Sequence, residues 1–246
     1  INSINSANNQ EAKKSTYLSN EPNLNIKKIF FSVEKISFSY PESKLFPLKD
    51  VSLTIEEGSK VGITGETGAG KSTLFHIMLG LLEPKTGNIF YKGQDIFKNL
   101  YQWRKEIGYI SQNIYLLDSS IKKNIAFNFL NEPIDNKKLE KAINIAHLSN
   151  KISELSDGIN TKVGTDGLKL SGGERQRIAL ARAIYREPNI FFMDESTSSL
   201  DLKTEEIIMN NIKNNFNDKT IIMIAHRKST IDKCDKVLNL ENGSIN

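Results

Sequence analysis

The residues with the clearest chemical potential form a glycine-rich run that ends in lysine and serine. The run fits the phosphate-binding pattern G-x-x-x-x-G-K-[ST], the P-loop, and consists of Gly65, Glu66, Thr67, Gly68, Ala69, Gly70, Lys71 and Ser72. Glycines let backbone N–H groups turn inward around phosphate oxygens, Lys71 reaches the β- and γ-phosphates, and the Ser72 hydroxyl binds Mg²⁺. An apolar strand precedes the run and a helix follows, so the helix N-terminus adds partial positive charge. A glycine-rich turn without a ligand is the alternative interpretation.

Two acidic residues, Asp194 and Glu195, end the apolar run of residues 190–193. The run reads as a buried parallel strand, and ligands of open α/β sheets bind at the carboxyl ends of such strands. Asp194 is then expected to hold Mg²⁺, mostly through water, and Glu195 to act as the general base on the attacking water. Surface carboxylates often follow strands, so the pair indicates hydrolysis only in combination with the phosphate loop.

A third feature is the run LSGGERQ at residues 170–176. Ser171 and Glu174 have the spacing of a capping box, and apolar periodicity continues through Ile178, Ala181 and Tyr185. This pattern predicts the start of a helix. The N-terminus of a helix also binds anions, so a cap and a phosphate contact are compatible.

The three motifs together resemble the ATP-binding cassette (ABC) ATPases, and their order along the chain (P-loop, LSGGERQ, acidic strand end) matches that family; the resemblance covers about residues 30 to 246. In that family the acidic strand end is called Walker B and LSGGERQ is the signature sequence. The resemblance implies that Ser171, Gly172 and Gly173 present a γ-phosphate-binding surface to a second copy of the domain. It also places Thr73, next to the P-loop serine, among the nucleotide-binding residues.

Four further residues are assigned by resemblance alone. Gln112 resembles the Q-loop glutamine, which meets Mg²⁺ and the attacking water, and His226 resembles the switch histidine at the γ-phosphate. Asp201 ends a run that resembles the D-loop, and Tyr40 resembles the aromatic residue that stacks on adenine. Taken alone, Gln112 is an exposed glutamine after a strand, His226 is a structural histidine and Tyr40 is a packing residue.

The run TKVGTDG at residues 161–167 resembles the X-loop of ABC exporters. Lys162 and Thr165 replace two of its usual acids, which affects the expected charge contacts with the membrane domain but not the exporter class.

The composition bounds the remaining possibilities. The formal net charge of +4 is mild and spread along the chain, which gives no case for nucleic acid as a partner. Cys234 is the only cysteine, so an internal disulfide and a cysteine metal site are excluded. The sequence has no apolar run long enough to span a bilayer. Residues 1–28 are rich in Asn, Ser and Lys, which favours a linker from a preceding transmembrane region over a processed N-terminus.

Hydrophobic periodicity predicts an α/β protein. Strands are expected over residues 31–40, 51–55, 60–64, 107–111, 190–193 and 220–225. Helices are expected from Ser72 to Pro84, over residues 137–146 and through Tyr185. We expect residues 29–246 to form a P-loop NTPase core, with a RecA-like mixed or parallel sheet flanked by helices. An antiparallel β subdomain and an inserted α-helical subdomain over about residues 113–168 complete this expected domain.

The reading that best fits these observations is the ATP-binding and ATP-hydrolysing domain of an ABC exporter, with ATP and Mg²⁺ as cofactors. Its expected partners are a second copy in a head-to-tail dimer and the transmembrane domain of the same polypeptide, at the cytoplasmic face of the membrane. The ATPase subunit of an importer and a non-transport ABC ATPase are the alternatives. The transported substrate is not encoded in the cassette.

Overall fold

The computed structural model describes residues 29–41, 47–127, 133–194, 200–225 and 227–245. The strands in these ranges are β1 (Ile29–Phe38), β2 (Leu48–Glu56), β3 (Lys60–Thr64), β4 (Thr86–Tyr91), β5 (Gln94–Asp95), β6 (Ile107–Ile110), β7 (Ile190–Asp194), β8 (Thr220–Ile224), β9 (Lys236–Glu241) and β10 (Ser244–Ile245). The α-helices are α1 (Lys71–Met78), α2 (Leu100–Glu106), α3 (Ile121–Ala126), α4 (Asn136–Ile145), α5 (Ser149–Ser153), α6 (Gly172–Tyr185), α7 (Leu202–Asn215) and α8 (Lys228–Ile231). The linker predicted for residues 1–28 lies outside the described residues.

A six-stranded sheet in the order β10-β9-β3-β8-β7-β6 forms the centre of the described part of the chain. All neighbouring strands in it are parallel except the β9–β10 pair. Strands β7 and β8 are buried along their whole length, which explains their continuous apolar sequences. Because side chains of a strand alternate between faces, Phe191 and Met193 join one hydrophobic cluster while Ile190 and Phe192 join another.

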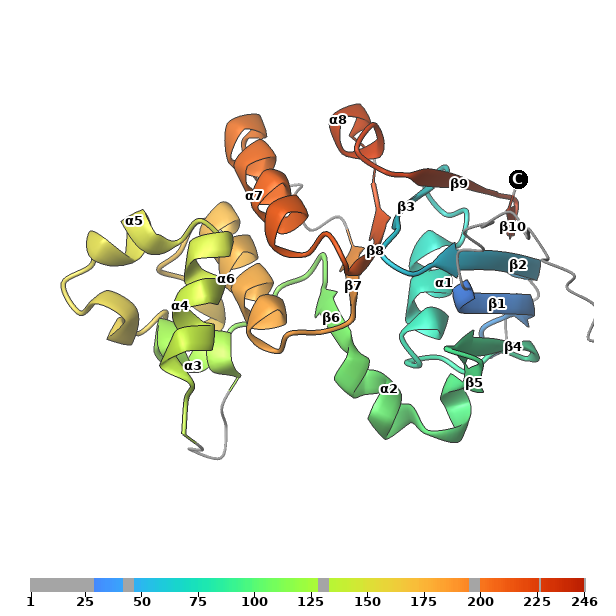
Figure 1. The fold of residues 1–246 in the computed structure, drawn as a ribbon, viewed down its shortest axis with the longest axis horizontal. Coiled ribbons are helices and arrows are strands. Elements are labelled where there is room, and N and C mark those ends of the chain that lie inside the picture. The colour runs from blue at the N-terminus through green and yellow to red at the C-terminus, as the bar shows by residue number, and fades with distance from the viewer. Residues whose placement is uncertain (1–28, 42–46, 128–132, 195–199, 226, 246) are drawn as a thin grey trace, which may run out of the picture.

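One face of this sheet packs against α1 and a second sheet, as Figure 1 shows. The second sheet is antiparallel, with the order β2-β1-β4-β5. Phe192 of the central sheet contacts Phe75 of α1 and Phe31 of β1, with ring centroids 5.5 Å and 6.3 Å apart. These contacts join the two sheets through one core. The predicted antiparallel β subdomain and P-loop NTPase fold are therefore confirmed.

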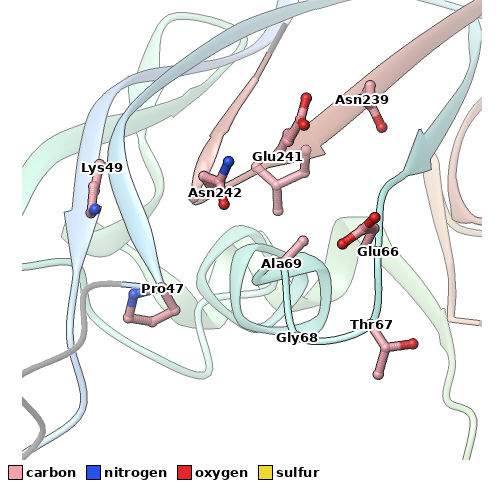
Figure 2. A pocket seen from close by; sticks show the side chains of 11 residues that line it. Pro47, Lys49, Glu66, Thr67, Gly68, Ala69, Asn239, Glu241 and Asn242 are labelled. Atoms are coloured by element: carbon pink, nitrogen blue, oxygen red, sulfur yellow. The ribbon is translucent and has the colours of Figure 1, made fainter.

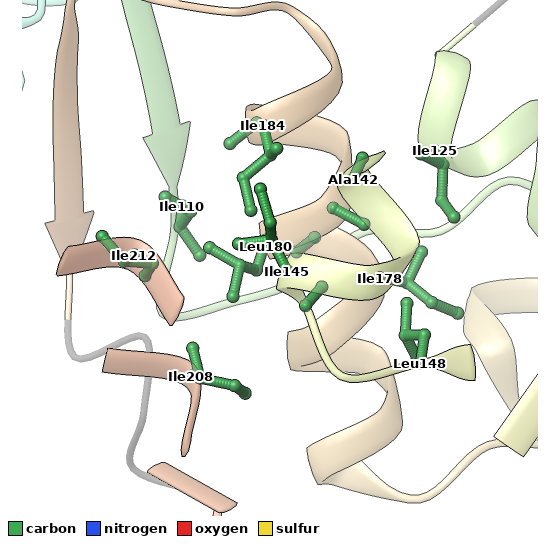
Figure 3. Packing of buried hydrophobic residues seen from close by; sticks show 14 of the residues in the cluster. Ile110, Ile125, Ala142, Ile145, Leu148, Ile178, Leu180, Ile184, Ile208 and Ile212 are labelled. Carbon is green, nitrogen blue, oxygen red and sulfur yellow. The ribbon is translucent and has the colours of Figure 1, made fainter. Parts of the chain in front are cut away.

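The other face is covered by helices α6 and α7, and α3 and α4 pack against α6. Figure 3 shows Ile178, Leu180 and Ile184 of α6 beside Ala142 and Ile145 of α4. The apolar periodicity after the LSGGERQ run is thus the face of α6 that the sheet and α4 bury. Signature residues at the start of α6 are consequently positioned by a helix that is packed along its length.

Two expectations from periodicity were imprecise. Strand β1 ends at Phe38, before Tyr40, and its pairing with β2 and β4 shifts register around Lys35, where φ is 50°. Helix α1 ends at Met78 and does not continue to Pro84. Gly80 adopts a φ of 68°, and Leu81, expected on the buried stripe, is 55% exposed. A left-handed glycine after the last turn ends a helix whatever apolar residues follow.

No helix within the described ranges combines the length and the apolar character needed to cross a bilayer.

Candidate nucleotide-binding site

The P-loop joins the carboxyl end of β3 to the first residue of α1. Two of its glycines are required by close packing of backbone against backbone. A Cβ on Gly65 would lie 2.2 Å from the Leu240 carbonyl oxygen, and one on Gly70 would lie 2.4 Å from the Pro47 carbonyl oxygen. Both have positive φ, 143° and 102°. The loop is therefore held tightly between β9 and the start of β2, in a conformation that side chains would prevent.

Lys71 turns back over this loop. Its Nζ donates hydrogen bonds of 2.8 Å to the carbonyl oxygens of Gly65 and Glu66, and the residue is buried, with 7% exposure. An ammonium group carries three protons, so two are used by the loop. Within the described residues no hydrogen bond uses the third, which is available to an anion. The two carbonyls thus hold the Lys71 ammonium inside the loop, at the position expected for a bound phosphate.

The carboxyl ends of the central strands converge next to the P-loop. Ile224 of β8 pairs with Ile63 of β3 on one side and with Asp194 of β7 on the other. Only β8 therefore lies between Asp194 at the end of β7 and strand β3, which leads into the P-loop. Asp194 is buried, with 6% exposure. Burial, and secondarily the Asp194 charge, raises the pKa of Tyr109 to about 12, so the neighbouring phenol stays neutral at pH 7. Glu195 and His226, predicted as catalytic residues, lie outside the described residues.

Tyr40 is attached to the P-loop helix. Its hydroxyl shares a 3.0 Å hydrogen bond with the Thr73 hydroxyl, and its ring meets Phe38 edge to face at 5.0 Å. The residue is nevertheless 43% exposed. An aromatic ring that is held at its edge and hydroxyl but remains open to solvent can stack on a planar base. Thr73 is buried in the first turn of α1, while Ser72 beside it is exposed.

Ser171 forms the predicted capping box at the start of α6. Its Oγ accepts a hydrogen bond from the Glu174 amide at 3.2 Å, and its own amide donates to Glu174 Oε2 at 2.9 Å. The first amides of a helix have no partner within the helix, and among the described residues nothing accepts from the Gly172 and Gly173 amides or from the Ser171 hydroxyl. The capping box therefore leaves the Ser171 hydroxyl proton and the amides of Gly172 and Gly173 able to bind an anion.

The P-loop and the signature helix line two different hollows. A hollow of about 690 Å³ adjoins the P-loop (Figure 2), lined by Pro47, Lys49, Glu66, Thr67, Gly68, Ala69, Asn239, Leu240, Glu241, Asn242 and Gly243. Another, of about 400 Å³, is lined by Gln112, Asn113, Ile114, Asp166, Gly172, Arg175 and Gln176. Gln112 thus lies with the signature helix. Neither Lys71 nor Tyr40 lines the 690 Å³ hollow. We therefore locate the phosphate site from the P-loop geometry and not from this hollow.

Asp201 acts as the N-cap of α7. Its side chain accepts a 2.9 Å hydrogen bond from the Thr204 amide, and hydrogen bonds from Thr204 lower its pKa. The carboxylate therefore has a structural role within this chain, whatever it contacts in an assembly.

Two residues that sequence reasoning missed also support the signature helix. Lys151 of α5 pairs with Glu174, their charged atoms 3.1 Å apart. Arg182 of α6 donates to the Asn124 carbonyl and side chain and to the Tyr115 carbonyl, at 2.9 to 3.1 Å. Neither has a sequence signal, because each partner lies on a distant segment.

Known proteins with similar sequences and structures identify the family of this chain. A family model described as ABC transporter matches residues 48–198. The chain belongs to the ABC transporter family. It is 40% identical over 213 residues to the exotoxin translocation ATP-binding protein PaxB of Pasteurella aerogenes, covering 86% of this chain and 30% of that protein. It is 39% identical over 217 residues to the leukotoxin translocation ATP-binding protein LktB of Mannheimia haemolytica, covering 88% and 30%.

Among solved structures, the chain resembles a bacterial Atm1-family ABC exporter with ATP bound. The TM-score is 0.83 at 33% identity, covering 90% of this chain and 39% of that one. The chain thus spans about a third of the length of these relatives and carries the ATPase domain of the family. The family resemblance predicted from the three motifs is confirmed. The relatives named here are toxin translocation ATP-binding proteins and a bacterial exporter.

Proposed function

We propose that this domain binds and hydrolyses ATP to drive export of a substrate across a membrane. The observation that carries the proposal is the P-loop, whose Lys71 ammonium is held by loop carbonyls one strand away from the buried Asp194 carboxylate. That arrangement joins a phosphate cradle to an oxygen ligand for a metal, as phosphoryl transfer requires.

We assign Mg²⁺ to the Ser72 hydroxyl and the Asp194 carboxylate. The fit rests on the donor set, because a hydroxyl and a carboxylate are both hard oxygen ligands. Mg²⁺ prefers few protein ligands and completes its shell with phosphate oxygens and water. When bound, it neutralises charge that develops on the phosphates. Gln112 is its further proposed ligand.

The remaining roles follow the family pattern. Backbone amides from Gly65 to Thr73 bind the phosphates, and the third proton of Lys71 is donated to them. Tyr40 stacks on the adenine. Glu195 takes the proton of the attacking water, which is the step that general-base catalysis accelerates, and His226 contacts the γ-phosphate.

The complete site contains two copies of the domain, arranged head to tail. Ser171, Gly172 and Gly173 of one copy complete the phosphate site of the other, and Asp201 lies at the same junction. The Ser171 hydroxyl and the first amides of α6, which nothing accepts from among the described residues, support this arrangement. Dimer closure on ATP and reopening after hydrolysis then form the mechanical cycle.

The second partner is a transmembrane domain of the same polypeptide, with this domain at the cytoplasmic face. The length of the relatives, of which the chain spans 30%, supports a further region. A candidate contact surface is the hollow of about 390 Å³ where exposed Leu81 and Phe127 lie beside Arg104, Arg182 and Arg186.

The first test concerns hydrolysis. Glu195→Gln keeps the size and hydrogen bonding of the side chain but removes the base, so ATP turnover should fall at least about a hundredfold. ATP binding should survive, and size-exclusion chromatography with ATP should then reveal a long-lived dimer. Glu206→Gln, at an exposed position of α7, is the matched control. Unchanged turnover in Glu195→Gln would contradict the assignment.

The second test concerns the shared site. If each site needs Ser171 of the other copy, the ATPase rate at low protein concentration should rise with roughly the square of concentration. Ser171→Arg should abolish turnover while the chain's own P-loop still binds ATP. A linear rate at all concentrations, with an active Ser171→Arg variant, would reduce the signature run to a capped helix.

A further inference from the structure

The ion pair between Lys151 and Glu174 lies at the start of α6. Lys151 Nζ and Glu174 Oε1 are 3.1 Å apart, and the side chains are 33% and 14% exposed. The other carboxylate oxygen, Oε2, accepts the Ser171 amide. A single carboxylate therefore joins the lysine of α5 (Ser149–Ser153) to the cap of the signature helix.

Glu174 is ionised in this position. Burial by itself raises the pKa of Glu174, but hydrogen bonds from Ser171 and the ammonium of Lys151 outweigh it, so the pKa lies below its ordinary value. A full negative charge consequently lies at the N-terminus of α6 at neutral pH.

This charge conflicts with the role proposed for the same helix end. A phosphate bound to the Ser171 hydroxyl and to the Gly172 and Gly173 amides would lie within one turn of the Glu174 carboxylate. Like charges at such separations repel, and the repulsion is larger where solvent is excluded, as between two closed domains. The carboxylate also partly neutralises the positive charge of the helix N-terminus, which would otherwise attract the phosphate.

We propose that Lys151 is a positioning residue for ATP, which neutralises the capping carboxylate so that the start of α6 accepts the phosphate of a nucleotide held by a second copy of this chain. The inference rests on the shared site proposed above. In this proposal Glu174 caps the signature helix and Lys151 of α5 balances its charge, so the two residues act together.

A purely structural salt bridge is the competing explanation, and the chain contains a matched example of one. Lys138 and Glu187 are 2.7 Å apart, each 43% exposed, and Glu187 follows the opposite end of α6. Partly exposed pairs contribute little to stability. If Lys151 only stabilised the fold, its removal should resemble the removal of Lys138.

The experiment compares four variants of the domain in steady-state ATPase assays over a range of ATP concentrations. Lys151→Met should raise the ATP concentration needed for half-maximal rate, by roughly three- to tenfold at low salt. The thermal midpoint should match that of Lys138→Met, which should keep wild-type ATP dependence. Lys151→Arg should restore the charge and the ATP dependence.

The fourth variant combines Lys151→Met with Glu174→Gln. Glutamine can still accept the Ser171 amide through its carbonyl oxygen, so the cap remains while the negative charge is removed. This double variant should recover most of the ATP dependence lost in Lys151→Met. The deficit of Lys151→Met should also shrink as salt rises, because salt screens partly exposed charges.

Two outcomes would overturn the inference. One is wild-type ATP dependence in Lys151→Met, and the other is a Lys151→Met deficit that Glu174→Gln does not relieve. Ser171→Arg, assayed in parallel, separates this failure from failure of the shared site. An inactive Ser171→Arg with a normal Lys151→Met rejects the role of Lys151 alone, whereas an active Ser171→Arg rejects the shared site on which that role depends.

Discussion

The hydroxyl groups of Tyr40 and Thr73 share a hydrogen bond of 3.0 Å, which ties the segment after β1 to the first turn of the P-loop helix. The bond links segments that follow strands of two separate sheets, since Tyr40 comes after β1 of the antiparallel sheet and Thr73 lies in α1, which follows β3 of the central one. The tyrosine ring is thereby placed at a defined position relative to the phosphate-binding residues, with one part of it exposed.

The first prediction separates the ring of Tyr40 from its hydroxyl. Tyr40→Ala should weaken the binding of ATP and GTP alike, since stacking tolerates different bases and contributes about 1–3 kcal/mol per base. Tyr40→Phe keeps the ring and loses only the bond to Thr73, so its affinity should stay near wild type and its unfolding free energy should fall by about 0.5–1.5 kcal/mol. Nucleotide titration followed by fluorescence measures the affinities, and urea unfolding measures the change in stability. Unaltered affinity in Tyr40→Ala would leave Tyr40 with a packing role only.

The second prediction concerns Lys71. Lys71→Met keeps the aliphatic length but removes the charge that binds phosphate, together with its hydrogen bonds to the Gly65 and Glu66 carbonyls. We expect at least a tenfold loss of ATP affinity, equivalent to about 1.4 kcal/mol, together with loss of turnover. Lys137→Ala, on an exposed turn of α4, controls for general loss of positive charge. Wild-type affinity and turnover in Lys71→Met would contradict the P-loop assignment.

The third prediction concerns stability at the joint between α3 and α6. The side chain of Asn124, fully buried, exchanges two hydrogen bonds with the Leu117 backbone, donates to the Ser120 carbonyl and accepts from Arg182, at 2.9 to 3.1 Å. Burial lowers the pKa of Arg182 to about 10, so the guanidinium remains charged at pH 7. Asn124→Ala removes the acceptor of the Leu117 amide and one of the hydrogen bonds of Arg182, and should lower the unfolding free energy by about 1–3 kcal/mol in urea titrations.

The control for this change is Asn136→Ala. The Asn136 side chain accepts a 3.3 Å hydrogen bond from Lys122 at the surface, and its loss should change stability by less than about 0.5 kcal/mol. Equal effects of the two substitutions would show that the buried network does not stabilise the joint.

Sequence was sufficient where the physical requirement is local. The P-loop needs glycines at positions of positive φ, a lysine and a hydroxyl within one short stretch of chain, and so it can be recognised without knowledge of the fold. The same holds for the Ser171–Glu174 capping box, which depends only on residues one helical turn apart. The buried strands β7 and β8 were readable because both of their faces are apolar.

Tertiary structure decided which distant residues meet. The chain between Met78 and Leu81 carries apolar residues that continue the helical pattern, yet the left-handed Gly80 ends the helix and leaves Leu81 exposed. The pairs Tyr40–Thr73 and Lys151–Glu174 join segments far apart in sequence, and only the packing of two sheets and of α5 against α6 brings them within hydrogen-bonding distance. Local backbone preferences are encoded residue by residue, whereas contacts between elements depend on the register and packing of the whole core, which no single stretch of sequence specifies.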